Sequence, residues 1–282
     1  MMKHIPVLLN AVMNELGDLN NKIVVDATFG AGGYTRAFLN AGASVVAFDR
    51  DPNVIDDAND IKKEFGDRFR FIAKPFSAMT DLQEQFDAIV FDLGISSMQI
   101  DIASRGFSFR NDAPLDMRMS ASGVSAADLI TQLTDVELAQ ILREYGDVPK
   151  SSILARAIKK AAPKTTFELR DLIYNPRDIA PVFQALRIAV NDEFGEIKRA
   201  LDGVPNLLKP GGKCLVVTFH SIEDRLVKNI FRDLTDIPGN PLIPVAASAP
   251  FKLIRAVTPG ADELENNPRA RSAHLRGVQK SY

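Results

Sequence analysis

The sequence predicts an α/β protein with a doubly wound, Rossmann-like parallel sheet that is interrupted by an inserted all-helical domain. Three observations predict this fold class. Apolar runs alternate with amphipathic segments through the first part of the chain, and a glycine-rich turn follows the first run. A middle segment then shows helical periodicity only, and strand-like runs return after it.

The elements of the first part follow one another with short connections. Strands are expected at 23–25, 44–49, 69–73 and 87–92, with helices at 35–41, after Pro52 and between the third and fourth strands. Such alternation implies parallel strands covered by helices, with a ligand crevice at the carboxyl ends of the strands. Asp26, Asp49 and Asp92 all fall at these ends.

Helical signals alone run from about residue 125 to residue 175. They include two capping boxes, Thr134-x-x-Glu137 and Thr165-x-x-Glu168. Strand signals return at 213–219, after a predicted turn at 209–212, and then at 251–257 and 275–279. We therefore assign 1–110 and 180–282 to the α/β domain and 111–179 to the helical insert.

Composition limits the class of protein. The chain has 282 residues, 46% of them hydrophobic and 25% charged, which is enough for a substantial core. A single cysteine and three histidines without ligand spacing predict no disulfide framework and no metal site. No apolar stretch is long enough for a membrane span, so we expect a cytoplasmic protein.

The charge is distributed unevenly. The net charge is −2, yet residues 251–282 carry six basic residues and three acidic ones. Because phosphate contacts are supplied by Lys and Arg, this C-terminal arm is where a polyanion is expected to bind.

The glycine turn suggests a nucleoside-bearing cofactor. Asp26 ends the first strand, and Gly30, Gly32 and Gly33 follow it. The dinucleotide fingerprint G-x-G-x-x-G fails because Thr35 stands where its third glycine belongs. The segment instead resembles D-x-x-x-G-x-G-G, the first motif of S-adenosylmethionine-dependent methyltransferases; a tight turn without a ligand is the alternative.

Asp49 and Asp92 are the other two acids at strand ends. Asp49 is placed to accept the hydroxyls of a ribose, because Asp51 before Pro52 is available to cap the next helix. Asp92 and the backbone after it could hold the N–H groups of an exocyclic amine and favour its attack on a methyl group. The alternative for Asp92 is a carboxylate that bonds the next turn.

The motifs after this point carry a specific resemblance. The chain resembles the RsmH (MraW) family of bacterial 16S ribosomal RNA cytosine-N4 methyltransferases over almost its whole length. The resemblance rests on the N-terminal segment from His4 and on six ordered segments: 92–99, 105–109, 114–119, 183–191, 219–225 and 267–273.

The resemblance implies an S-adenosylmethionine enzyme that methylates N4 of a cytidine in the decoding region, with 16S rRNA within the small ribosomal subunit as its partner. It implies a catalytic role for Asp92. The implied cofactor contacts are Gly32, Gly33, Tyr34, Asp49, Phe76, Asp92 and Gln99, to which the glycine motif adds Asp26 and Gly30. Phe76 suits packing against adenine, and an ordinary core aromatic is the equal alternative.

Further residues are expected to contact the RNA. A cation and two aromatics at Arg105, Phe107 and Phe109 suit stacked bases and phosphates, with packing under the loop as the alternative for the two rings. Arg187 and Asn191 share a helix face, where an ion pair of Arg187 with Asp192 or Glu196 is the alternative. The other expected RNA contacts are Arg118, His220 beside the expected helix cap Ser221, Arg269 and Arg271.

Two departures from the family keep a rival function open. Tyr34 stands where the family commonly has His, and Ala11 stands where it has Glu. They motivate one rival, a ribosome-assembly binding protein without catalysis. The other rival keeps the fold and is a nucleotide-dependent oxidoreductase, which Thr35 at the position of the third glycine distinguishes. The oligomeric state is left open, with a homodimer as one option.

Overall fold

The computed structural model describes residues 6–236 and 249–281, and gives no side-chain account of Ser97, Met98, Asn266, Pro268 and Arg269. The chain divides into two compact units, one made of residues 1–94 and 195–282 and the other of residues 95–194.

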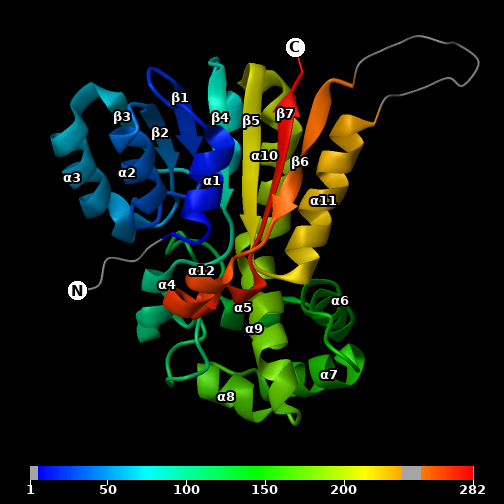
Figure 1. Ribbon diagram of the computed structural model, residues 1–282. Helices are drawn as coiled ribbons and strands as arrows, with labels where there is room; N and C mark the ends of the chain where they lie inside the picture. The colour runs from blue at the N-terminus through cyan, green and yellow to red at the C-terminus, as the bar shows by residue number, and fades with distance from the viewer. Residues whose placement is uncertain (1–5, 237–248, 282) are drawn as a thin grey trace, which may run out of the picture. The chain divides into compact units, whose positions relative to one another are not determined.

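Unit 1 is built on a seven-stranded sheet of order β3-β2-β1-β4-β5-β7-β6, whose strands lie side by side in Figure 1. The strands are β1 (Ile23–Asp26), β2 (Ser44–Phe48), β3 (Phe69–Ile72), β4 (Phe86–Asp92), β5 (Leu208–Thr218), β6 (Phe251–Val257) and β7 (His274–Lys280). The first five pair in parallel, and β7 runs antiparallel to both β5 and β6. The predicted Rossmann-like α/β fold is confirmed.

The order of the parallel strands locates the ligand crevice. The chain adds β2 and β3 on one side of β1, and then adds β4 and β5 on the other side. β1 and β4 are neighbours in the sheet, and the chain connections that follow them run in opposite directions, from β1 to β2 on one side and from β4 to β5 on the other. In open α/β sheets this switch point is where ligands bind, outside the carboxyl ends of the strands.

The helices of unit 1 are α1 (Leu9–Leu16), α2 (Gly33–Asn40), α3 (Ile55–Phe65), α11 (Ser221–Thr235), α12 (Ala261–Asn266) and most of α10 (Glu193–Leu207), with short 3₁₀ turns η1 (Pro52–Val54), η2 (Gly66–Arg68), η3 (Phe76–Asp81) and η5 (Pro268–Ser272). Apolar residues of the central strands are fully buried, among them Val24, Ile89 and Leu215. Such continuous apolar runs are typical of a parallel sheet covered on both faces.

One predicted turn lies inside a strand. Phe86 of β4 pairs with Leu208, whereas Ala88 pairs with Lys213, so residues 209–212 bulge out of β5. Gly211 has a φ of 78°, and a Cβ at Gly212 would lie 2.9 Å from the carbonyl oxygen of Lys209. The glycine pair that predicted a turn before the strand therefore forms a bulge within it.

Unit 2 consists of helices and loops. Its helices are α4 (Ser97–Asp101), α5 (Ala126–Gln132), α6 (Asp135–Gly146), α7 (Ser151–Ala161), α8 (Thr166–Asp171) and α9 (Pro176–Asn191), with the 3₁₀ turn η4 (Ala103–Arg105). Both predicted capping boxes are present: Thr134 caps α6 and Thr165 caps α8. The unit is wider than the predicted insert 111–179, because Phe107 before it and Phe183 and Leu186 after it belong to the same apolar core.

Candidate active site

Three carboxylates meet at the carboxyl edge of the sheet in unit 1. Asp26 is the last residue of β1, Asp92 is the last residue of β4, and Asp49 directly follows β2. Asp26 is paired in register with Ala47 on one side and with Val90 on the other. The predicted placement of the three acids at strand ends is confirmed.

The glycine turn after β1 is shaped by close contacts. Gly30 and Gly32 have φ values of 51° and 75°, a region that side chains disfavour. A Cβ at Gly32 would lie 2.5 Å from Cδ1 of Ile61, and a Cβ at Gly33 would lie 2.4 Å from Cγ of Pro6. The turn therefore brings bare backbone to the start of α2.

Asp49 holds this turn in place. Its Oδ2 accepts a hydrogen bond from the Gly30 N–H at 2.9 Å, and its Oδ1 accepts one from the Asp51 N–H at 2.9 Å. Asp51 in turn caps η1 through the Asn53 N–H, as predicted. Burial raises the pKa of Asp49, although its side chain remains partly exposed. Each carboxylate oxygen has a second lone pair, so ligand hydroxyls can still bind there.

Asp26 is fully enclosed. Its Oδ2 accepts from the Thr35 hydroxyl at 2.6 Å, and its Oδ1 accepts from the Thr28 N–H at 3.2 Å. Burial raises the pKa of Asp26 from 3.8 to about 6, against the opposing effect of these two hydrogen bonds. Thr35, which occupies the position of the third glycine in the dinucleotide fingerprint, thus fixes the orientation of the Asp26 carboxylate.

Asp92 has an unusual environment. Its N–H donates to the Thr28 hydroxyl at 2.7 Å, but its Oδ1 is buried and has no hydrogen-bond partner within the described residues. Burial raises the pKa of Asp92 well above its ordinary value, and the charges of Asp26 and Glu223 raise it further. A buried acceptor of this kind is costly unless a ligand satisfies it.

The carboxylates of Asp26 and Asp92 form no ion pair with any Lys or Arg of the described segments. Their joint potential therefore favours a positively charged group or an N–H donor at this edge of the sheet. Sequence reasoning missed Thr28 and Glu223. Glu223 is buried and accepts from the Phe219 N–H at 2.7 Å. Its position could have been recognised from the sequence, because a glutamate three residues after a helix cap commonly accepts a backbone hydrogen bond there.

The other expected cofactor residues occupy different places. Phe76 is partly exposed and meets Phe91 edge to face, with ring centroids 5.4 Å apart. Gln99 belongs to unit 2, where it is buried and its Oε1 accepts from the Ser96 N–H at 3.1 Å. Neither contact by itself shows a cofactor role.

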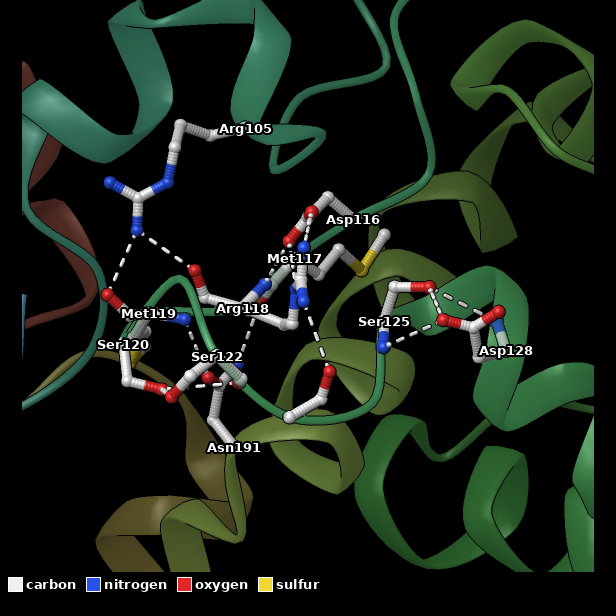
Figure 2. A network of polar contacts seen from close by, with 11 residues as sticks. Arg105, Asp116, Met117, Arg118, Met119, Ser120, Ser122, Ser125, Asp128 and Asn191 are labelled. Atoms are coloured by element: carbon white, nitrogen blue, oxygen red, sulfur yellow. Dashed lines mark hydrogen bonds and ion pairs between the residues drawn. The ribbon is translucent and has the colours of Figure 1, made fainter.

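Several residues expected to bind RNA hold a loop of unit 2, residues 116–123 (Figure 2). The Arg105 guanidinium donates to the carbonyl oxygens of Arg118 and Met119 at 2.8 and 2.9 Å. Arg118 binds Asp116 through two nitrogens and donates to the Gly123 carbonyl at 3.0 Å.

Asn191 fixes the same loop from α9. Its amide group accepts from the Met119 N–H at 2.8 Å and donates to the carbonyl oxygens of Met117 and Arg187 at 2.7 and 2.9 Å. Met117 has a φ of 62°, a strained value for a side-chain-bearing residue. The loop is thus held in a defined conformation by the side chains that the sequence assigned to RNA.

The remaining expected RNA residues of unit 2 also have internal contacts. Phe107 is buried in the core, and Phe109 meets Phe183 edge to face at 5.4 Å. Arg187 forms a two-point ion pair with Glu193, at 2.7 and 3.0 Å, and both side chains are largely buried. The predicted ion pair therefore involves Glu193 instead of Asp192 or Glu196.

In unit 1, His220 caps α11, since its Nδ1 accepts from the Glu223 N–H at 3.3 Å. The predicted cap at Ser221 was wrong by one residue, because Ser221 is already the first residue of the helix. Arg271 is exposed on η5, and the side chain of Arg269 lies outside the described part of the structure.

The described residues contain no group of three or more His, Cys, Asp or Glu side chains that could hold a metal ion. Among them, no helix has both the length and the apolar character needed to cross a bilayer.

Comparison with known proteins gives the family. A model of the MraW methylase family matches residues 1–281. The chain belongs to the MraW methylase family. Ribosomal RNA small subunit methyltransferase H of Mesorhizobium japonicum is 46% identical over 293 residues, covering 98% of this chain and 87% of that protein. The protein of the same name from Chelativorans sp. strain BNC1 is 45% identical, covering 99% and 87%.

Among solved structures, an rRNA methylase from Streptococcus thermophilus is 13% identical with a TM-score of 0.48, covering 100% of this chain and 99% of that one. The family assignment rests on the sequence matches alone. Membership of a methylase family overturns the oxidoreductase alternative.

In this MraW family member, Tyr34 has defined contacts. The Tyr34 ring is buried against Phe38, with centroids 5.8 Å apart, and its hydroxyl donates to the Val7 carbonyl. The Leu8 N–H beside it donates to the carboxylate of Glu263 on α12. Tyr34 thus ties the N-terminal segment to the glycine turn, while Ala11 lies in the first helix of unit 1.

Proposed function

We propose that this protein uses S-adenosylmethionine to methylate N4 of a cytidine in the decoding region of 16S ribosomal RNA, within the small ribosomal subunit. The observation that carries the proposal is the buried Asp92 Oδ1, which has no partner within the described residues and lies at the switch point of the sheet. Family membership and the names of the relatives support the reaction class and the kind of RNA.

The residues present fit S-adenosylmethionine. The bare backbone of Gly30 to Gly33 gives room for a nucleoside, and Asp49 has lone pairs left for ribose hydroxyls. Phe76, partly exposed beside Phe91, offers an apolar surface to adenine. When bound, this cofactor supplies a methyl group on a positively charged sulfonium, and the carboxylates of Asp26 and Asp92 would stabilise that charge.

Asp92 would act on the target base. The N4 amine of cytidine is a poor nucleophile, because its lone pair is delocalised into the ring. A carboxylate that accepts an N–H of this amine favours the geometry needed for attack and stabilises the positive charge that develops on nitrogen. The base must be unstacked from its neighbours to reach a buried acceptor.

The test uses small subunits from a strain that lacks the corresponding gene. The purified protein and methyl-labelled S-adenosylmethionine should yield labelled N4-methylcytidine on nucleoside analysis. Absence of this nucleoside would refute the proposal. Cofactor binding without transfer would instead support a binding protein that has lost catalysis, the alternative motivated by Tyr34 and Ala11.

The protein would be cytoplasmic, because its substrate would be the small ribosomal subunit. Cell fractionation tests this location. A homodimer would double the mass measured by light scattering.

A further inference from the structure

A cavity of about 460 Å³ lies in unit 1, and none of Asp26, Asp49 and Asp92 lines it. One side is formed by the start of α11 and contributes His220, Arg225 and Lys228. The other side is formed by the C-terminal part of the chain and contributes His274 and Arg276. Three cationic side chains and two imidazole rings therefore line one cavity.

Two of these cations are not neutralised. Arg225 and Lys228 are exposed, stand three residues apart on α11, and form no ion pair with any acid among the described residues. Residues at this spacing lie on the same side of a helix. Their charges are therefore available together to a ligand in the cavity.

The lining carboxylate is already bound. Asp224 accepts from Nε and Nη2 of Arg276 at 2.6 and 2.7 Å, and from the Thr218 hydroxyl at 3.2 Å. The Arg276 guanidinium lowers the pKa of Asp224, which therefore stays ionised and paired. Its repulsion of an incoming anion is offset, and the remaining charge of the lining is positive.

The cavity also provides neutral donors. Ser221 and Ser272, which carry hydroxyl groups, are among its lining residues, and Ser221 is the first residue of α11. The first N–H groups of a helix have no acceptor within the helix, so its beginning adds donors and a partial positive charge. Cations that form no ion pair, hydroxyl groups and the beginning of a helix are together the groups that bind a phosphate.

We propose that this cavity binds a backbone phosphate of the RNA substrate, with Arg225 and Lys228 as its principal ligands. The inference rests on the proposed function for the identity of the RNA, but concerns a site separate from the carboxylates that would perform the chemistry. One phosphate held here would fix the strand on unit 1 without reading its sequence.

The test is the double substitution R225Q/K228Q. The matched control is R143Q/K198Q, which removes the same two charges from exposed side chains outside the cavity that form no ion pair among the described residues. The pair R225K/K228R keeps the charges and should behave as wild type.

With small subunits as substrate, R225Q/K228Q should raise KM about tenfold and leave kcat and the Kd of S-adenosylmethionine unchanged, because it removes binding without touching the reacting groups. The slope of log affinity against log salt for single-stranded RNA should fall by about 0.7 for one lost phosphate contact. The control should change neither quantity. Equal KM and equal salt slope in R225Q/K228Q and wild type would overturn the inference.

A binding measurement separates this inference from the proposed function. Fluorescence anisotropy with a labelled single-stranded RNA needs no methyl transfer. If wild type transfers no methyl group but R225Q/K228Q still binds this RNA about tenfold more weakly, the proposed function fails and the phosphate site stands. Weaker binding to small subunits with unchanged binding to naked RNA would indicate an acidic protein partner and would overturn the phosphate assignment.

Discussion

Replacing Asp26 by asparagine removes a buried negative charge while keeping the shape of the side chain. The amide oxygen can accept from the Thr28 N–H, and the Thr35 hydroxyl can rotate to accept from the new amide nitrogen. Both hydrogen bonds of the carboxylate thus have a counterpart in the variant. The main change is the loss of a charge that burial disfavours.

The size of the effect follows from the pKa of Asp26. Folding raises this pKa from 3.8 to about 6, and at 1.36 kcal/mol per pKa unit the ionised carboxylate costs roughly 3 kcal/mol. Between these two pH values the Asp26 carboxyl group is ionised in the unfolded chain but still protonated in the folded one. The stability of the wild type therefore falls as pH rises from about 4 to about 6, and the full loss persists above that pH.

The assay is urea unfolding followed by circular dichroism, since the chain has no tryptophan to report by fluorescence. D26N should be more stable than wild type by about 3 kcal/mol at pH 8, and the difference should shrink to below about 1 kcal/mol near pH 4 and vanish at lower pH. D202N, at an exposed acid of α10, should show no such pH-dependent gain. Equal stability of D26N and wild type at pH 8 would refute the claim that Asp26 is held in an environment that opposes its charge.

Three further substitutions test the site and its surroundings. D92N should lower kcat by about 10²-fold to 10³-fold in the methyl-transfer assay, because the side chain loses the negative charge that would stabilise the amine. Near-normal turnover would remove Asp92 from the mechanism. Y34F leaves the Val7 carbonyl without its donor and should cost about 1–3 kcal/mol in urea unfolding; no change would mean that this bond contributes nothing. N191A removes three hydrogen bonds from a buried site and should destabilise the protein by at least about 2 kcal/mol. Unchanged stability together with weaker RNA binding would instead assign Asn191 to the RNA.

The sequence contained enough information to place the acids of the site. Parallel strands end at one edge, so Asp26, Asp49 and Asp92 had to gather once the alternation of strands and helices was recognised. The tight turn at Gly30 and Gly32 was equally predictable, because both residues have a positive φ, which few residues other than glycine tolerate. These predictions depended on local patterns and on one rule of topology.

The partners of polar side chains were not predictable in the same way. An arginine in a loop has the same sequence signature whether it faces RNA or backbone carbonyls, as Arg105 does here. The partner of Arg187 depends on Asp192, whose φ of 48° ends α9 and turns the chain so that Glu193 becomes the neighbour. Helical spacing alone cannot anticipate such a reversal.

The division of unit 1 along the sequence has a consequence for folding kinetics. Its central strands β4 and β5 are neighbours in the sheet, yet the whole of unit 2 lies between them in the chain. The helices α6, α7 and α9 of unit 2 pack on one another within one continuous stretch of chain, whereas pairing β4 with β5 requires closure of a loop that contains the whole of that stretch. A unit 2 that folds first shortens this loop. Core substitutions in unit 2, such as those at Leu186, should therefore slow the assembly of a sheet to which they contribute no strand.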